Sequence, residues 1–459
     1  MDKQSIEALF KQQKNFFESG ATMDVEYRRD ALKRLKKSLN IYEDKMTAAL
    51  LADMGKSTFE SYLTELGPVK NELSYILKHL DSFAKTKYVK ADPRHLLSLA
   101  MQKPVPYGTV LIIAPWNCPL LLTLQPMIEA IAAGNTVILK PSSVSPSTGN
   151  VLVDVIESAF PPEYVSVVNG GRDETDALLD LDVDYIFFTG RKENGREIMK
   201  RASEHIVPVT LELSGKNPCI VDRSANIRAA ARRIVFGKFI NCGQNGAAPD
   251  YILADAFIKD QLIADIKLEI RSQFGKEPIS SPDYGRIINK YHYDRLTKLI
   301  DSKKVVFGGE CDPDKNRIAP TIMDHVTFDD PCMQDEIFGP ILPILTYTGV
   351  NDAIAKVKKN PDPLALYIFA KDSAFISKVI DRVPYGGGCV NDTMAQIANP
   401  MLSFSGVGES GMGAYHGKYG FDTFTHYKNI VNKSRFAEMS FRYAPANPIK
   451  LAVQKIITH

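Results

Sequence analysis

The sequence has few of the residues from which metal sites and disulfide frameworks are built. Among its 459 residues are six cysteines and eight histidines, and both types are scattered singly, with no CxxC pair. Structural zinc sites and disulfide-rich folds need such residues at short, paired spacings. We therefore predict reduced thiols and no bound metal.

The sequence also lacks an excess of charge of either sign and any long apolar run. Lys and Arg number 56 and Asp and Glu 54, so the formal net charge is +2. This balance predicts no nucleic-acid or anionic-membrane partner and favours a small molecule. No stretch reaches the roughly 18–20 apolar residues of a spanning helix. The N-terminus, MDKQSIEALFKQQKNFF, does not resemble a signal peptide, so we expect a cytoplasmic protein without a membrane partner.

What the chain does have is enough length and apolar material for two or three domains, with 44% hydrophobic residues. From about residue 6 to residue 83 the apolar residues recur every three or four positions, which predicts successive amphipathic helices. Short β-rich runs then alternate with helical segments, which predicts a parallel α/β sheet. These runs are GTVLIIA (108–114), TVILK (136–140), VSVVN (165–169), YIFFT (185–189) and VTLEL (209–213). A second alternating series extends from IVFGKFI (234–240) to GGGCVND (386–392) and predicts a second α/β unit.

Eight short motifs occur along the chain in an order that resembles one family, the NAD(P)-dependent aldehyde dehydrogenases. They are APWN (114–117), ILKPS (138–142), FTG (188–190) followed by Gly195, LELSGKNP (211–218), FINCGQ (239–244), EIFGP (336–340), VND (390–392) and GESGMGAYHG (408–417). APDY (248–251) and SGMGAYHGK make the class 3 branch the most similar. The resemblance spans about residues 20–430 and implies an α/β, aldehyde dehydrogenase-like fold in three parts. Residues 1–210 would form a helical start and a parallel-sheet NAD(P)-binding domain, 211–400 an α/β catalytic domain, and 401–459 a small oligomerisation segment that returns to the cofactor domain and builds a homodimer interface.

The implied reaction converts an aldehyde, NAD(P)⁺ and water into a carboxylate and NAD(P)H through a thioester. Such a reaction needs a nucleophile, an oxyanion donor, a hydride acceptor and a base. The resemblance assigns the oxyanion donor to the side-chain amide of Asn117, a contact typically worth ~3–4 kcal/mol. It assigns the base to Glu212, which stands in the apolar run VTLEL, where burial would raise its pKa. The structural alternatives are a helix cap for Asn117 and an ion-paired glutamate for Glu212.

The resemblance also assigns the cofactor contacts. Lys140 follows a strand at the edge where α/β sheets bind ligands, and it would contact the adenosine ribose. Gly190 and Gly195 open the next helix, whose N-terminal amides favour a pyrophosphate. Glu336 and Phe338 match the residues that hold the nicotinamide ribose and pack beside its ring, although a core aromatic is the alternative for Phe338.

Two residues at the adenosine end depart from the family pattern. Ser143 stands where the family often has a glutamate that repels the extra phosphate of NADP. Arg191 stands where a small residue is usual, and it adds a positive charge. Both changes favour NADP being accepted at least as well as NAD, and the alternative for Arg191 is a solvated surface charge.

The catalytic nucleophile of the family is absent from this chain. In the family, GQ is followed by one variable residue and then by the catalytic cysteine, whereas here that position is Gly246. Cys242 lies ~6 Å away if the segment is helical and up to ~13 Å away if it is extended. A misplacement of only ~1 Å can cost about 10²-fold in rate. Cys242 therefore cannot simply replace the missing residue.

Loss of a covalent nucleophile typically lowers kcat by about 10⁴–10⁶-fold. One hypothesis is an aldehyde dehydrogenase in which glycine has replaced the cysteine, by design or recently. The alternative is a catalytically silent NAD(P)-binding homologue with a structural or binding role. A third hypothesis is catalysis by another thiol, Cys242 or Cys118. The presence of Asn117, Glu212 and Glu336 favours the first.

Overall fold

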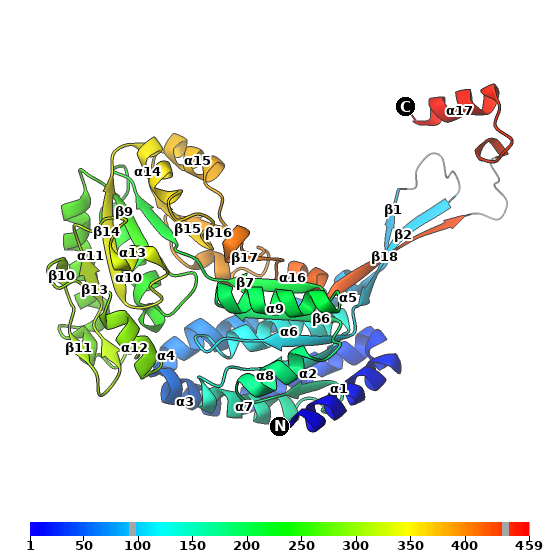
Figure 1. The fold of residues 1–459 in the computed structure, drawn as a ribbon, viewed down its shortest axis with the longest axis horizontal. Helices are drawn as coiled ribbons and strands as arrows, with labels where there is room; N and C mark the ends of the chain where they lie inside the picture. Colours follow the sequence, from blue (N-terminus) through cyan, green and yellow to red (C-terminus); the bar gives the residue numbers. More distant parts are fainter. Residues whose placement is uncertain (91–97, 434–439, 459) are drawn as a thin grey trace.

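A computed structural model describes residues 1–90, 98–433 and 440–458 of the chain. The chain opens with helices, as the apolar spacing predicted (Figure 1, blue). Leu32, Leu35 and Leu39 are buried together because residues three or four apart share one face of a helix. A π-helical turn at Tyr62–Leu66 joins the last two helices of this region. The helices are α1 (Lys3–Glu18), α2 (Val25–Ile41), α3 (Glu43–Met54), α4 (Thr58–Ser61) and α5 (Gly67–Ala84).

The first large sheet has six strands in the order β17-β7-β6-β3-β4-β5. Neighbouring strands run parallel, as predicted, except that β17 is antiparallel to β7. The strands are β3 (Thr109–Ile113), β4 (Thr136–Lys140), β5 (Val165–Val167), β6 (Tyr185–Gly190), β7 (Val209–Leu213) and β17 (Gly411–Met412). The helices along this part of the chain are α6 (Leu121–Ala133), α7 (Pro146–Glu157), α8 (Arg172–Leu179) and α9 (Lys192–Glu204).

Helices cover both faces of this sheet, which is why β3 and β4 are buried at every position. Residues of α1, α8 and α9 form the core on one face. Residues of α2, α3, α5, α6 and α7 form the core on the other. Open parallel sheets of this kind bind ligands beyond the carboxyl ends of their strands. The loops after β3, β4, β6 and β7 are therefore where a site is expected.

The second large sheet has seven strands in the order β10-β13-β14-β9-β8-β15-β16, and only β10 is antiparallel to its neighbour. Its strands are β8 (Pro218–Val221), β9 (Tyr251–Asp255), β10 (Val305–Phe307), β13 (Thr321–Met323), β14 (Ile341–Tyr347), β15 (Ala365–Phe369) and β16 (Gly387–Val390). A separate two-stranded sheet consists of β11 (Cys311–Asp312) and β12 (Arg317–Ile318). The helices of this region are α10 (Ile227–Phe239), α11 (Lys259–Phe274), α12 (Lys290–Thr297), α13 (Pro331–Gln334), α14 (Val350–Val357) and α15 (Ser373–Arg382).

The two sheets confirm the predicted α/β class, with differences in detail. The second series was predicted to begin at residues 234–240, but most of these residues lie in α10, and the strand before that helix, β8, was not predicted. Strand β7 pairs with β6, so the chain leaves the first sheet after residue 213, slightly later than the predicted boundary at 210.

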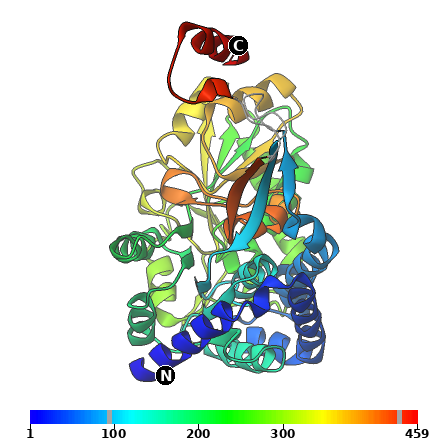
Figure 2. The ribbon, with the colours of Figure 1, turned by 90° about the vertical axis from the view of Figure 1, so that its right-hand side faces the viewer.

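A three-stranded antiparallel sheet projects from the body of the molecule (Figure 1). It consists of β1 (Lys87–Val89), β2 (Ser98–Pro106) and β18 (Thr425–Lys433). Helix α16 (Gly417–Thr423) precedes β18, and α17 (Pro448–Thr458) follows it. Figure 2 shows the N-terminus and α17 at opposite ends of the molecule. Residues 91–97 of the predicted first domain, and 434–439 and 459 of the predicted C-terminal segment, lie outside the described residues.

Within the described ranges, no helix is long and apolar enough to cross a membrane. Three or more His, Cys, Asp or Glu side chains do not come together in metal-binding geometry anywhere in this part of the chain. All six cysteines are described, and none forms a disulfide.

Candidate active site

Asn117 lies in the loop after β3, at the carboxyl edge of the first sheet. The residue is 6% exposed, and its side-chain amide donates a hydrogen bond to the backbone oxygen of Gln244 over 3.1 Å. Helix α6 has Leu120 at its N-cap and no side-chain cap, so Asn117 is not a helix cap. The amide instead points at the loop that leads to Gly246, two residues after Gln244.

Gly246 has a backbone conformation that other amino acids can adopt, because its φ lies outside the left-handed region. A Cβ at this position would lie 3.2 Å from the Cβ of Ser214 and 3.8 Å from the Cδ2 of Leu364. A movement of a few tenths of an ångström by Ser214 would relieve the closer contact. A Cβ on Gly243, by contrast, would lie 2.3 Å from the backbone oxygen of Gly339, and its φ is +71°. Gly243 must be glycine for backbone reasons, whereas Gly246 need not be.

Glu212 lies inside β7 and is 2% exposed. Among the described residues, neither of its carboxyl oxygens has a hydrogen-bond partner. Burial raises the pKa of Glu212 well above the usual range, in agreement with its place in an apolar run. Burial first and then the charge of Glu212 raise the pKa of Tyr415, which places these two groups close together. Unpartnered buried carboxyl groups are rare in native proteins and gather at functional sites.

Ser214 connects the strand of Glu212 to two other predicted positions. It follows β7 directly, and its Cβ is the nearest atom to a Cβ built at Gly246. Its hydroxyl donates a hydrogen bond to the carboxylate of Glu336. Burial, and then the neighbouring Asp250 carboxylate, raise the pKa of Glu336 to about 8. We did not single out Ser214 from the sequence, although it lies within the LELSGKNP motif.

Phe338 and Trp116 bring the loop of Glu336 against the loop of Asn117. Phe338 has φ of 48°, a backbone conformation that is uncommon for an aromatic residue. Its half-exposed ring stands edge-on to Trp116, with 5.5 Å between the ring centroids. Strain of this kind is often found at ligand sites. A fully buried core aromatic would show neither the exposure nor the strain.

Lys140 and Ser143 occupy the same edge of the first sheet, one strand further along. Lys140 ends β4 and is 3% exposed, and its ammonium group donates to the carbonyl oxygens of Gly170 at 2.7 Å and Pro141 at 3.0 Å. Burial lowers its pKa. Ser143 is exposed in the loop between β4 and α7.

Gly190, Arg191 and Gly195 form the turn from β6 into α9. Arg191 is the N-cap and is exposed, and no side chain caps the first turn of this 13-residue helix. A Cβ on Gly195 would lie 2.8 Å from the Cδ2 of Leu213, so glycine allows α9 to lie close against β7. The uncapped N-terminus of such a helix attracts anions.

Two residues of α12 that the sequence did not indicate lie against the loops of Trp116 and Ile337, and the charge of Arg191 affects the pKa of both. Arg295 donates to the backbone oxygen of Ile337 over 2.6 Å, and burial and then the charge of Arg191 lower its pKa. Burial, Arg295 and Arg191 together lower the pKa of His292 to about 4, and its ring lies 5.0 Å from that of Trp116. Two guanidinium groups near a helix N-terminus suit phosphate groups. An Arg and a His within an ordinary helix gave no signal in the sequence.

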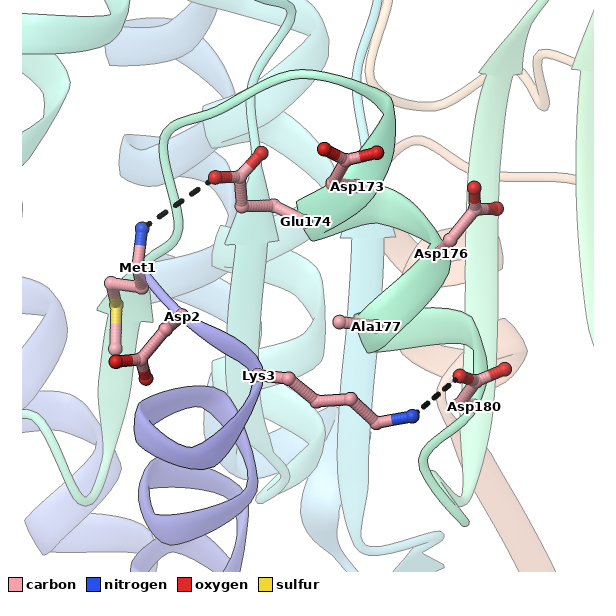
Figure 3. Close-up of a pocket in the computed structure, with 8 residues that line it drawn as sticks. All are labelled: Met1, Asp2, Lys3, Asp173, Glu174, Asp176, Ala177 and Asp180. Carbon is pink, nitrogen blue, oxygen red and sulfur yellow. Dashed lines mark hydrogen bonds and ion pairs between the residues drawn. The ribbon is translucent and has the colours of Figure 1, made fainter.

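The hollow drawn in Figure 3 does not belong to this arrangement. It lies between the start of α1 and helix α8, and most of its side chains are acidic. The amino group of Met1 pairs with Glu174 at 3.7 Å, and Lys3 pairs with Asp180 at 3.1 Å. The charges there are largely satisfied within the protein itself.

A second hollow shares one residue, Leu364, with the surroundings of Gly246. Its lining includes Leu364, the residue whose Cδ2 is 3.8 Å from the Cβ built at Gly246. Leu402, Phe404 and Tyr419 also line it. Gln396, Ser403 and Ser405 add polar groups to the lining.

A model of the aldehyde dehydrogenase family matches residues 1–430 of the chain. The chain belongs to the aldehyde dehydrogenase family. This aldehyde dehydrogenase is 47% identical over 442 residues to 4,4'-diaponeurosporen-aldehyde dehydrogenase of Staphylococcus aureus, with 96% of each chain covered. It is 40% identical over 441 residues to aldehyde dehydrogenase family 3 member A2 of Rattus norvegicus, covering 96% of this chain and 91% of the relative. The predicted similarity to class 3 is thereby confirmed.

Solved structures agree with this assignment. This aldehyde dehydrogenase superposes with a TM-score of 0.97 on the substrate-bound state of Staphylococcus aureus AldH, at 45% identity and with 99% of each chain covered. A more distant likeness is a P. syringae indole-3-acetaldehyde dehydrogenase mutant in complex with NAD+ and IAA. Its TM-score is 0.87 at 24% identity, with 94% of this chain and 90% of that chain covered, and it shows the shared fold.

Proposed function

We propose that this aldehyde dehydrogenase oxidises an aldehyde to a carboxylate with NAD(P)⁺ when residue 246 is cysteine, and that the chain with Gly246 does not turn over. The observation that carries the proposal is the contrast between two glycines of one loop. Gly243 has a left-handed φ, and a Cβ there would lie 2.3 Å from a backbone oxygen, whereas Gly246 lies outside the left-handed region and a Cβ there would need Ser214 to move by only a few tenths of an ångström. If glycine were required at position 246, we would expect the surrounding atoms to exclude a Cβ there, as they do at Gly243.

The proposed roles follow from the chemistry of the residues around Gly246. Asn117 would donate its amide hydrogen to the oxyanion, in exchange for its present bond to the backbone oxygen of Gln244. Glu212 would take a proton from the hydrolytic water, and its raised pKa suits a base that works near neutral pH. The hollow that shares Leu364 with the surroundings of Gly246 would offer a partly apolar approach for the aldehyde.

Neither buried thiol near the site is suited to replace the missing cysteine. The thiolate is the reactive form of cysteine, so a raised pKa makes a thiol less nucleophilic at neutral pH. Cys242 is 1% exposed, and burial raises its pKa. Cys118 is 4% exposed, and burial raises its pKa to about 12. These values speak against catalysis by another thiol.

The residues at the edge of the first sheet fit NAD(P). The adenosine ribose would lie against Lys140 and Ser143. The pyrophosphate would lie at the turn from Gly190 to Gly195. The nicotinamide ribose and ring would lie against Glu336 and Phe338. When bound, NAD(P)⁺ supplies the acceptor for the hydride of the aldehyde. The dimeric NADP-preferring aldehyde dehydrogenase of Rattus norvegicus, 40% identical to this chain, supports NADP as a cofactor here. Exposed Arg191 adds a positive charge suited to the extra phosphate.

The test is to replace Gly246 by cysteine and to follow the absorbance of NAD(P)H with aldehyde present. We expect Gly246→Cys to form NAD(P)H about 10⁴–10⁶ times faster than the parent chain. Gly246→Ala is the matched control, because it adds the Cβ without the thiol, and it should remain inactive. Absence of a gain in Gly246→Cys, with NAD(P) still bound, would favour the catalytically silent homologue. A covalent adduct on Cys242 or Cys118 of the parent chain, detected by intact mass, would favour the third hypothesis.

We also propose that this chain forms a homodimer. The sheet of β1, β2 and β18 projects from the body and exposes apolar side chains, such as Tyr88 at 68% and Val431 at 58%. Projecting apolar surfaces of this kind mark protein interfaces. Light scattering coupled to size-exclusion chromatography should give twice the mass of one chain. A monomer at micromolar concentration would contradict this part. A cytoplasmic location stays a prediction.

A further inference from the structure

One buried side chain, that of Asn241, forms hydrogen bonds with both the loop of Asn117 and the loop that leads to Gly246. The amide of Asn241, which is 3% exposed, donates to the backbone oxygen of Asn117 at 2.8 Å and to that of Gln244 at 3.0 Å. The amide of Asn117 bonds the same Gln244 oxygen at 3.1 Å. The distance between the proposed oxyanion donor and the proposed nucleophile position is therefore set by this cluster.

The loop before Gly246 is held in a strained backbone conformation. Asn241 and Cys242 have φ of 53° and 52°, so two consecutive non-glycine residues are left-handed. This conformation costs roughly 1–2 kcal/mol per residue unless contacts stabilise it. The carboxylate of Glu60, which is 7% exposed, accepts a hydrogen bond from the backbone N–H of Asn241. Glu60 thus stabilises the first of the two strained residues.

A buried ion pair stabilises the loop of Asn117. Lys56 and Glu65 are both 0% exposed, and the Lys56 ammonium lies 2.5 Å from the Glu65 carboxylate. Lys56 also donates to the backbone oxygen of Asn117 at 3.2 Å. The second oxygen of Glu65 accepts from the N–H groups of Leu120 at 2.8 Å and Leu121 at 3.3 Å, where α6 begins. Burial alone would lower the pKa of Lys56, but the Glu65 charge raises it, so the ammonium stays charged.

Glu60 lies in α4, and Glu65 lies in the π-helical turn at Tyr62–Leu66 that follows it directly. Residues five apart in a regular α-helix point about 140° away from each other. A π turn bonds residues five apart and so brings them towards the same face. Glu60 and Glu65 both reach the buried side, one to each loop.

We propose that Glu60, together with the Lys56–Glu65 pair, is a positioning device that fixes the loops of Asn117 and Gly246 relative to one another. None of these three side chains is assigned contact with substrate or cofactor. The catalytic consequence rests on the proposed function, whereas the ordering of the loops does not. The two parts are therefore tested separately.

The ordering is tested on the chain as it exists, by hydrogen–deuterium exchange of the peptide that contains residues 240–246. Glu60→Met keeps the side-chain volume but removes the acceptor of the Asn241 N–H, and we expect exchange in this peptide to be at least about tenfold faster. Glu60→Gln keeps an acceptor oxygen and should restore slow exchange. The matched control is Asp184→Ala, which removes a carboxylate that accepts from the N–H of Thr109 over 2.7 Å at the opposite edge of the sheet. It should leave the 240–246 peptide unchanged.

The catalytic consequence is tested in the Gly246→Cys background. Because a shift of ~1 Å in a reacting group can cost about 10²-fold, we expect Glu60→Met to lower kcat about 10–100-fold. The KM for NAD(P)⁺ should change less than about twofold, because the cofactor contacts lie on other loops, and Glu60→Gln should recover most of kcat. If Glu60→Met does not fold, Glu60→Ala replaces it, since it also removes the acceptor of the Asn241 N–H and leaves both hydrogen bonds of the Asn241 side chain in place.

Unchanged exchange in Glu60→Met would overturn the proposal, as would an equal loss of kcat in Asp184→Ala, which would show a general loss of stability. If Gly246→Cys itself is inactive, the proposed function is wrong. The positioning role of Glu60 is then tested by the exchange measurement alone.

Discussion

The two glycines of the 243–246 loop give the sharpest test of whether residue 246 once carried a side chain. In Gly243→Ala the new Cβ meets the backbone oxygen of Gly339 at 2.3 Å and adopts φ of +71°. The left-handed conformation costs roughly 1–2 kcal/mol and the overpacking typically 1–3 kcal/mol. We expect Gly243→Ala to lose about 2–5 kcal/mol of unfolding free energy.

Gly246→Ala should behave differently, although it adds the same methyl group to the same loop. Its Cβ meets the Cβ of Ser214 at 3.2 Å, and its φ is ordinary. A lower backbone entropy of the unfolded chain stabilises by about 0.4–1 kcal/mol. This gain offsets the small movement of Ser214, so the net change should lie within about 1 kcal/mol of zero.

The assay is the melting temperature of the parent chain and the two variants, measured without ligand. Gly243→Ala should melt several degrees lower, and Gly246→Ala within about one or two degrees of the parent. If Gly246→Ala were as unstable as Gly243→Ala, glycine at 246 would be a backbone requirement. The interpretation of residue 246 as a vacated nucleophile position would then be wrong.

Three further predictions concern the base and the cofactor edge. In the Gly246→Cys background, kcat should fall as the pH drops through the pKa of Glu212, which burial raises well above the usual range of a carboxyl group, because a base that activates the hydrolytic water must be deprotonated; Glu212→Gln should remove this limb and lower kcat about 10²–10⁴-fold. Gly195→Val should weaken NAD(P) binding at least about tenfold in a fluorescence titration. The reason is that even a Cβ at this position lies 2.8 Å from Leu213, so larger atoms would push α9 away from β7. An unchanged Kd would mean that this turn does not bind the cofactor. Arg191→Ala should weaken NADP about tenfold and NAD less than about twofold, and equal losses would mean that Arg191 does not meet the extra phosphate.

Many positions of the candidate site could be named from the sequence because the resemblance to the family rests on short, local motifs. Two of these residues, Lys140 and Gly190, end apolar strands of the first sheet, and Glu212 lies within a third strand of the same sheet. The carboxyl ends of parallel strands lie at a common edge, where ligands bind. The burial of Glu212 followed from its place in the apolar run VTLEL. Arg295 and His292 could not be predicted, since nothing in an ordinary amphipathic helix says which loop its polar side chains will meet.

The sequence by itself determined the α/β class, the order of β3, β4, β5, β6 and β7 in the chain and the chemical types at the candidate site, because periodicity and short motifs act over a few residues. Only the tertiary structure decided that Gly246 has room for a side chain and Gly243 does not, since the atoms around them come from Ser214 and Gly339. It also decided that Lys56 reaches Asn117, 61 residues away, and that Glu60 reaches Asn241, 181 residues away. Such contacts depend on how distant segments pack, and no local pattern of residues encodes them.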